Sequence, residues 1–174
     1  MGYYVNTEDI NVVVPKDLIE PAYKAVLALQ DRNDLKRGGS FGPGNERRYW
    51  FSWMPEDLST LSDLKEVFTH LGFTDTDYNA NGDLVLGRYD NKTGNEDIFC
   101  YVIAPFVQEG SYVYWRGEDD SYWKWEYRDG KMFAYGGERE IIWDTVSRDV
   151  MEDAISNNLA MEEYRKRLEE ARNA

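Results

Sequence analysis

The stretch from Ser111 to Tyr135 constrains the fold more than any other part of the chain. Aromatic residues recur there at every second position, which is the period of a half-buried β-strand. One face of a strand over 122–128 is apolar and consists of Trp123, Trp125 and Tyr127. The opposite face is more polar and consists of Tyr122, Lys124, Glu126 and Arg128. Asp129-Gly130 predicts a tight hairpin turn and 117–120 a looser one, so the stretch predicts a three-stranded antiparallel meander.

The apolar face of this meander has two interpretations. Exposed rings would form a platform on which bases or sugars stack. Buried rings would form the hydrophobic core, because large aromatic side chains dominate core energetics. We favour the core.

The rest of the chain alternates strand and helix signals. Residues 3–14 contain a strand that Pro15 ends, and a helix follows to about residue 31, with its regular part starting at Pro21. Residues 32–48 read as irregular, and a strand is expected at 49–53. A second helix covers 60–71, with Ser59 or Thr60 as its cap and Gly72 at its end.

Further along, 73–79 and 83–89 predict a hairpin around Asn81-Gly82. Residues 95–108 predict a third helix closed by Gly110, although 98–103 would also suit a strand and Pro105 would kink the helix. A short strand is expected at 140–143, and a helix from about residue 148.

This order of elements predicts the α+β class. We expect an antiparallel or mixed sheet with helices packed on one face, with a ferredoxin-like arrangement as one option. Residues 1–147 form a single domain in this interpretation, and 148–174 form a C-terminal helical tail. The narrow apolar stripe of the tail would dock on the domain or pair with a second copy to make a homodimer; docking is favoured because short isolated coils are marginal.

Charge and cysteine content limit the possible partners. The 174 residues include 33 acidic and 20 basic side chains, for a formal net charge of -13. Such a chain is a poor general binder of nucleic acid or anionic membranes, but it suits a protein with a basic surface. A single cysteine, Cys100, excludes an intrachain disulfide and fits a reducing compartment. With neither a signal peptide nor a run of transmembrane length, we expect a soluble cytoplasmic protein.

The loop over 36–48 is the basic, glycine-rich cluster of this acidic chain. Its cations are Lys36, Arg37, Arg47 and Arg48. Backbone N–H groups beside glycines and these four cations would hold a phosphate, while Tyr49 or Trp50 would stack on a base. No Walker or dinucleotide fingerprint is present. The alternative is a long surface loop whose arginines pair with nearby carboxylates.

Two other features of the chain argue against a metal site and a catalytic site. Residues 77–84 carry oxygen ligands at the spacing of a calcium loop, but Arg88 stands where the bidentate carboxylate belongs, so a hairpin is favoured. His70 is the single histidine and Cys100 has no basic neighbour, so no catalytic constellation can be assembled. We expect no catalytic residues, no metal and no cofactor.

Three segments resemble small uncharacterised proteins encoded by bacteriophages. They are Asp34–Gly39, Trp50–Pro55 and Tyr112–Asp119, and the resemblance covers roughly residues 1–135. It implies no activity and no residue roles. It implies a setting, because small acidic phage proteins without catalytic groups are often host-interaction or anti-defence factors.

Two hypotheses follow. The first is a phage accessory protein that binds and inhibits a host protein, such as a defence protein, through an acidic surface. The second is a small-ligand or nucleotide-binding protein that sequesters its ligand with the loop over 36–48. An enzyme ranks third.

Overall fold

The structure is a computed structural model that describes residues 2–138 together with Glu169 and Glu170, which are helical. The chain divides into two units, residues 1–139 and 140–174, and the following account concerns the described part of the first. The predicted strand at 140–143 lies outside the described residues, as does the predicted tail over 148–174 apart from Glu169 and Glu170.

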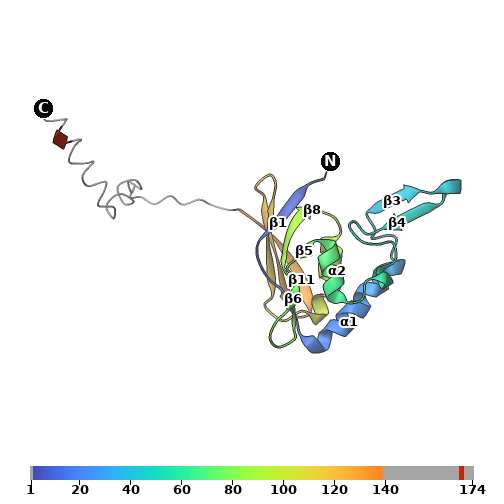
Figure 1. The fold of residues 1–174 in the computed structure, drawn as a ribbon, viewed down its shortest axis with the longest axis horizontal. Helices are drawn as coiled ribbons and strands as arrows, with labels where there is room; N and C mark the ends of the chain where they lie inside the picture. The colour runs from blue at the N-terminus through green and yellow to red at the C-terminus, as the bar shows by residue number, and fades with distance from the viewer. Residues whose placement is uncertain (1, 139–168, 171–174) are drawn as a thin grey trace. The chain divides into compact units, whose positions relative to one another are not determined.

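A six-stranded sheet, antiparallel throughout, forms the centre of the fold (Figure 1). Its strands lie in the spatial order β11-β10-β9-β1-β8-β5. In that order the strands are Lys131–Gly137, Tyr122–Arg128, Tyr112–Gly117, Tyr4–Asn11, Arg88–Lys92 and Phe73–Thr74. The prediction of an α+β fold with an antiparallel or mixed sheet is confirmed.

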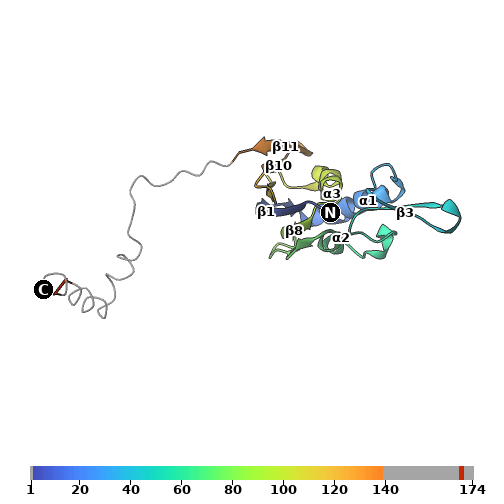
Figure 2. The same ribbon diagram turned by 90° about the horizontal axis from the view of Figure 1, so that it is seen from above.

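Three helices lie on one side of this sheet (Figure 2). They are α1 at Lys16–Leu27, α2 at Leu64–Leu71 and α3 at Glu96–Val102. The core between the layers is rich in aromatic rings: the centroid of the Tyr89 ring lies 5.1 Å from that of Phe73 and 5.5 Å from that of Trp115. Trp125 and Tyr127 are buried in the same core, which confirms the core interpretation of their face.

The meander of β9, β10 and β11 forms as predicted. Asp129 and Gly130 both have positive φ, 53° and 66°, which is the backbone that a two-residue turn between antiparallel strands requires. The register between β10 and β11 runs without a bulge from Arg128 opposite Lys131 to Tyr122 opposite Gly137. The second hairpin prediction is also confirmed: β6 (Asp77–Tyr78) pairs with β7 (Leu84–Val85) across Asn81-Gly82, beside β2 (Val13–Val14).

Polar side chains of the 77–84 segment serve this hairpin. The side-chain oxygen of Asn79 accepts hydrogen bonds from the backbone N–H groups of Asn81 and Asp83, at 2.9 and 3.0 Å. One carboxylate oxygen of Asp83 accepts from the backbone N–H of Lys16 at 3.0 Å. The side chain of Asn79, one of those that suggested a calcium loop, therefore satisfies backbone donors of the hairpin, and Asp83 does the same at the start of α1.

Two predicted helix starts were wrong. The first helix begins at Lys16, directly after Pro15, and holds Pro21 in its interior. Pro21 lacks the N–H that would bond the carbonyl of Asp17, and because Asp17 is exposed, water can reach that part of the chain. The second helix begins at Leu64, with Asp63 as its cap through a 2.7 Å bond from the Glu66 N–H.

The helix ends were predicted better. Gly72 closes α2 with φ of 119°, as expected. Residues 96–102 are helical, so the helix interpretation of this segment was right and the strand alternative wrong. The α-helix ends at Val102, and a short 3-10 turn over Ala104–Phe106 carries Pro105.

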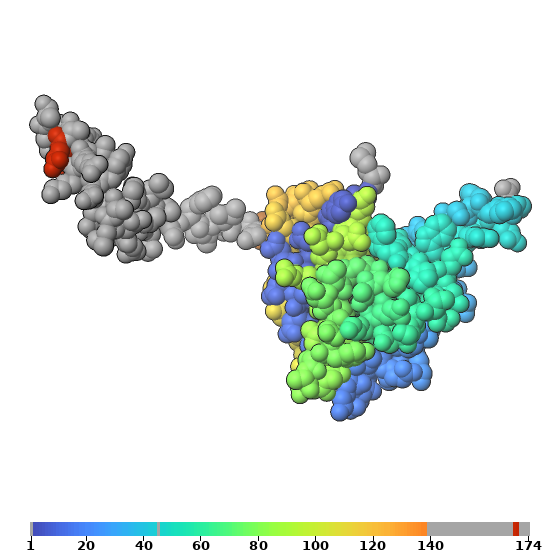
Figure 3. All heavy atoms as spheres, viewed as in Figure 1, coloured from blue at the N-terminus to red at the C-terminus, as the bar shows by residue number. Residues whose placement is uncertain are grey.

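The segment 32–48, predicted to be irregular, contains most of a further hairpin, β3 (Gly38–Phe41) and β4 (Arg47–Trp50), which projects from the body (Figures 1 and 3). Gly38 lies opposite Trp50, and a Cβ on Gly38 would lie 2.3 Å from the indole nitrogen. Glycine is therefore required where the sequence showed a break. The strand predicted over 49–53 ends at Trp50.

Candidate functional site

The hairpin of β3 and β4 carries the residues predicted to bind a ligand, and two of its cations are held by the protein itself. The ammonium of Lys36 donates to the carbonyl of Gln30 at 2.6 Å and to the side chain of Asn33 at 2.8 Å. The guanidinium of Arg37 donates to the carbonyl of Gly94 and forms an ion pair with Asp97 at 2.6 Å. Both residues fasten the base of the hairpin to the body.

The other two cations lie on opposite faces of the hairpin. Arg47 is paired with Phe41 and shares its face with Tyr49, because every second residue of a strand points to the same side. Arg48 shares the other face with Trp50. The guanidinium carbon of Arg47 lies 5.5 Å from the centroid of the Phe41 ring. The structure thus brings Arg47 together with Tyr49, and Arg48 together with Trp50, rather than all four cations around one point.

A shallow pocket of about 280 Å³ lies along the hairpin. Its lining residues are Gly39, Ser40, Phe41, Arg47, Arg48 and Tyr49. Phe41 is 69% exposed, the most exposed large apolar side chain in the described part of the chain. The outer half of the hairpin therefore offers one or two cations and aromatic rings to a ligand, without Lys36 or Arg37.

A buried polar cluster behind the hairpin base was missed from the sequence. Asn95 is fully buried; its side-chain oxygen accepts from the N–H of Ser52 at 2.8 Å, and its amide nitrogen donates to the carbonyl of Leu35 at 3.2 Å. Glu96 is also buried and accepts from the N–H of Gly94 at 2.6 Å. The polar residues at the start of α3 indicated a helix start. The bonds of Asn95 to Ser52 and Leu35 join residues far apart in the chain, so no local sequence pattern predicts them.

The sheet face opposite the helices carries a second group of aromatic residues. The rings of Tyr112 and Tyr114 stack with centroids 4.7 Å apart. The ammonium of Lys124 lies 4.9 Å from the centroid of the Tyr135 ring and pairs with Glu126 at 2.6 Å. This open face therefore combines exposed rings with a cation that the chain already neutralises.

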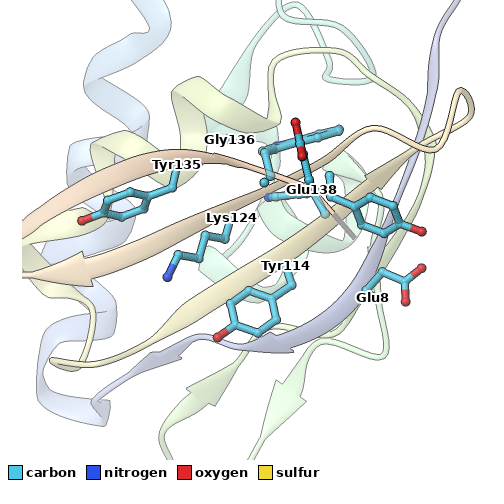
Figure 4. A pocket seen from close by; sticks show the side chains of 10 residues that line it. Glu8, Tyr114, Lys124, Tyr135, Gly136 and Glu138 are labelled. Carbon is cyan, nitrogen blue, oxygen red and sulfur yellow. The ribbon is translucent and has the colours of Figure 1, made fainter. Parts of the chain in front are cut away.

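A pocket of about 340 Å³ opens on this face (Figure 4). Lys124 lies between the rings of Tyr114 and Tyr135, with Glu8 and Glu138 farther along the same pocket. The pocket reaches the edge strand β11 at Gly136 and Gly137.

Five carboxylates belong to this pocket or to the turn that leads into its lining residue Tyr122. They belong to Glu8, to the turn between β9 and β10, and to Glu138; the turn residues are Glu118, Asp119 and Asp120. Arg116 reaches two of these residues, Asp120 at 2.5 Å and Glu8 at 3.5 Å. We call this group the acidic rim.

Asp119 is the member of the acidic rim whose carboxylate accepts hydrogen bonds from the hydroxyl of Tyr3 and from the N–H of Ser121. Hydrogen bonds from Tyr3 first, and then from the side chain and the N–H of Ser121, lower the pKa of Asp119 to about 2. The same contact raises the pKa of the Tyr3 hydroxyl, so Asp119 is a carboxylate and Tyr3 is neutral near pH 7.

The two side chains considered for catalysis lie apart from both surfaces. Cys100 is fully buried in α3, and burial raises the pKa of its thiol well above the ordinary value. His70 is exposed near the end of α2. Within residues 2–138 and 169–170, no three His, Cys, Asp or Glu side chains are placed to hold one metal ion.

Comparison with family models, with curated proteins and with solved structures finds no match. None of the helices in the described part of the chain is long and apolar enough to cross a membrane.

Proposed function

We propose that this protein acts by binding a protein with a basic surface, and that it inhibits a host protein, such as a defence protein, during bacteriophage infection. The resemblance to phage proteins supplies the setting. The acidic rim carries the proposal, since three consecutive carboxylates occupy the turn between β9 and β10 and Arg116 joins one of them, Asp120, to Glu8. A partner that presents lysine and arginine would gain favourable long-range attraction as well as direct pairs.

Aromatic rings beside the rim support the same proposal. Tyr114 and Tyr135 line the pocket that Glu8 and Glu138 border. Tyrosine and arginine are enriched in the centres of protein interfaces, and an arginine can stack on a tyrosine ring while its guanidinium meets a carboxylate. A surface of rings rimmed by carboxylates therefore suits arginine-bearing partners better than polyanions.

The experiment is a pull-down of the tagged full chain from bacterial lysate at low and at high salt, with bound proteins identified by mass spectrometry. We expect a dominant partner that is released as salt rises, because screening weakens attraction between exposed charges. A partner retained equally at high salt would contradict the acidic-surface mechanism.

A matched pair of variants localises the effect. Glu118→Gln with Glu138→Gln removes two exposed charges of the acidic rim, and we expect the partner to elute at lower salt. Asp17→Asn with Glu56→Gln changes the net charge equally at exposed positions outside the rim. If both double variants elute alike, net charge rather than the acidic rim governs binding.

A second candidate is a small-ligand or nucleotide-binding protein that uses the basic loop over 36–48, whose outer part is the hairpin of β3 and β4. The pocket between Phe41, Arg47 and Tyr49 favours it, since a cation beside aromatic rings suits an anionic ligand with a planar ring. A nucleotide panel in a thermal-melt assay tests it: a ligand at a hundredfold its Kd stabilises by about 2.7 kcal/mol. Absence of any shift, or an equal shift in Arg47→Ala, would contradict this candidate.

Several finer assignments belong to the same proposal. A ferredoxin-like core is supported by the spatial order β9-β1-β8-β5, with α1 and α3 in the two crossovers. We place the protein in the cytoplasm of the host cell, where the proposed partner is found. Pairing of two copies through the helical tail over 148–174 remains an alternative to docking of that tail.

A further inference from the structure

Strand β11 is one edge of the six-stranded sheet. Among the described residues it pairs with β10 alone, over seven consecutive positions without a bulge. The opposite edge strand, β5, has two residues. Edge strands are usually shortened, bulged, covered or interrupted by proline, because free backbone groups invite another strand. In β11 the single charged residue is Lys131, at its start.

The backbone groups that point away from β10 can be assigned from the register. Arg128 and Lys131 close a two-residue turn, so they exchange both of their hydrogen bonds, and such pairs alternate with non-bonded pairs along the ladder. The N–H groups of Met132, Ala134 and Gly136 therefore point outward. The opposite side of β10 agrees, since the N–H of Tyr127, which faces Met132, bonds to Ser111 instead.

Small residues leave room beside this edge on the core side of the sheet. Ala134 lies opposite Trp125, and Gly136 lies opposite Trp123, which is partly exposed. Ala134 and Gly136 are themselves exposed, and a Cβ on Gly136 would meet no atom within 4 Å. Apolar side chains of an added strand would pack there against the edges of the two indoles.

The other side of the edge is aromatic, and Glu138 follows it; Arg128 donates to the Tyr135 hydroxyl at 2.8 Å and lies 4.3 Å from the centroid of the Phe133 ring. Tyr135 points to the open face, and the pocket beside it is bordered by Glu8 and Glu138 (Figure 4). Lys124 in the same pocket is neutralised by Glu126. A long basic side chain on this side of an added strand, placed beside Gly137, would reach Glu138, the carboxylate that directly follows β11.

We propose that the free edge of β11 receives an extended segment of the partner protein in which apolar residues alternate with arginine or lysine. The inference deepens the proposed function and rests on it, because charge complementarity with the acidic rim selects a basic partner. Backbone hydrogen bonds would supply affinity, and the two side-chain rows would supply specificity.

The test uses the isotopically labelled full chain and two synthetic ten-residue peptides of equal composition. One alternates valine and arginine; the other has five valines followed by five arginines. We expect the alternating peptide to bind at least tenfold more tightly, and to slow amide exchange at Met132, Ala134 and Gly136. Equal binding of both peptides, or protection confined to other residues, would overturn the proposal.

Two variants at position 134 distinguish backbone pairing along β11 from attraction by surface charge. Ala134→Pro removes an outward N–H without breaking a bond to β10, whereas Ala134→Ser keeps that N–H. We expect Ala134→Pro to lower the affinity for the alternating peptide by about tenfold, because one hydrogen bond at the interface is lost. We expect Ala134→Ser to leave this affinity unchanged. Amide exchange in the unaltered chain gives the answer independently if Ala134→Pro fails to fold.

Other occupants of the edge give distinct results. If the three amides are already protected in the free protein and stay protected on dilution, the chain's own residues occupy the edge and the proposal fails. If that protection disappears on dilution, a second copy occupies it, and the proposal fails too.

The two proposals can fail separately. If a lysate partner is released by salt but binds the Ala134→Pro variant as well as the unaltered chain, binding through the acidic surface is supported and strand addition at β11 is refuted. Protection of β11 by the alternating peptide, with no salt-sensitive partner in the lysate, would refute the acidic-surface mechanism and sustain the edge.

Discussion

Replacing Asn95 by alanine tests whether the buried polar cluster holds the hairpin of β3 and β4 to the body. The side chain of Asn95 bonds the N–H of Ser52 and the carbonyl of Leu35, at positions 43 and 60 residues away in the chain. Alanine removes both bonds and leaves both partners without them. Because Ser52 and Leu35 are partly buried, water only partly replaces the lost bonds.

The magnitude follows from these two groups. A buried polar group left unsatisfied costs about 1–3 kcal/mol, so Asn95→Ala should lower the free energy of unfolding by about 3 kcal/mol. For a chain of this length that corresponds to a fall in Tm of about 6–12 °C. Urea unfolding followed by tryptophan fluorescence gives the free energy, and a thermal melt gives Tm. The exchange rate of the Ser52 amide should rise more than the global loss of stability explains.

Asn11→Ala is the matched control. Asn11 is exposed on β1, so the same chemical change there should alter stability by less than about 0.5 kcal/mol. If Asn95→Ala were as mild as Asn11→Ala, the cluster would not anchor the hairpin, and our account of the Leu35 and Ser52 contacts would be wrong.

Three further predictions concern the turn, the acidic rim and the thiol. Gly130→Val should destabilise the protein by about 1–2 kcal/mol in urea unfolding, because Gly130 has a φ of 66° that valine adopts poorly; an unchanged midpoint would contradict the turn assignment. Asp119 should titrate near pH 2 in the folded protein when followed by carboxyl NMR. Its contribution to stability should be complete above the unfolded pKa of about 3.9 and should be lost as the pH falls towards 2. Tyr3→Phe should raise the pKa of Asp119 in the folded protein. Cys100 should resist a thiol reagent in the native protein and react on unfolding, since its thiol is fully buried; fast native labelling would show that α3 opens.

The sequence predicted those parts of the fold whose signals are local. Asn81-Gly82 and Asp129-Gly130 mark two turns, because positive φ at a turn is a property of the residues in it. The two faces of β10 followed from alternation alone. The start of α1 was placed too late because Pro21 was weighed as a helix breaker, whereas Pro15 precedes the first turn and α1 tolerates one missing hydrogen bond.

The hairpin of β3 and β4 was missed for a physical reason. Gly38, Gly39 and Ser40 have low strand propensity and no apolar alternation, so the segment resembles a loop. What makes Gly38 suitable is the indole of Trp50 across the ladder, a contact between residues twelve positions apart. Strand propensity describes each residue in its local segment, so it does not predict a pairing that depends on a contact across the hairpin.

The cation cluster shows the same limit at the candidate site. Four cations within thirteen residues looked like one clamp, yet the partners of Arg37 are Gly94 and Asp97, about sixty residues away. Variants of Lys36 or Arg37 would therefore loosen the hairpin base, and a loss of ligand binding in them would report instability. Arg47 and Arg48 lie on the outer half and can be changed without cutting these bonds. Binding that survives Arg37→Ala but is lost in Arg47→Ala would thus locate a ligand on the hairpin, whereas the reverse pattern would show that the hairpin matters through its anchorage.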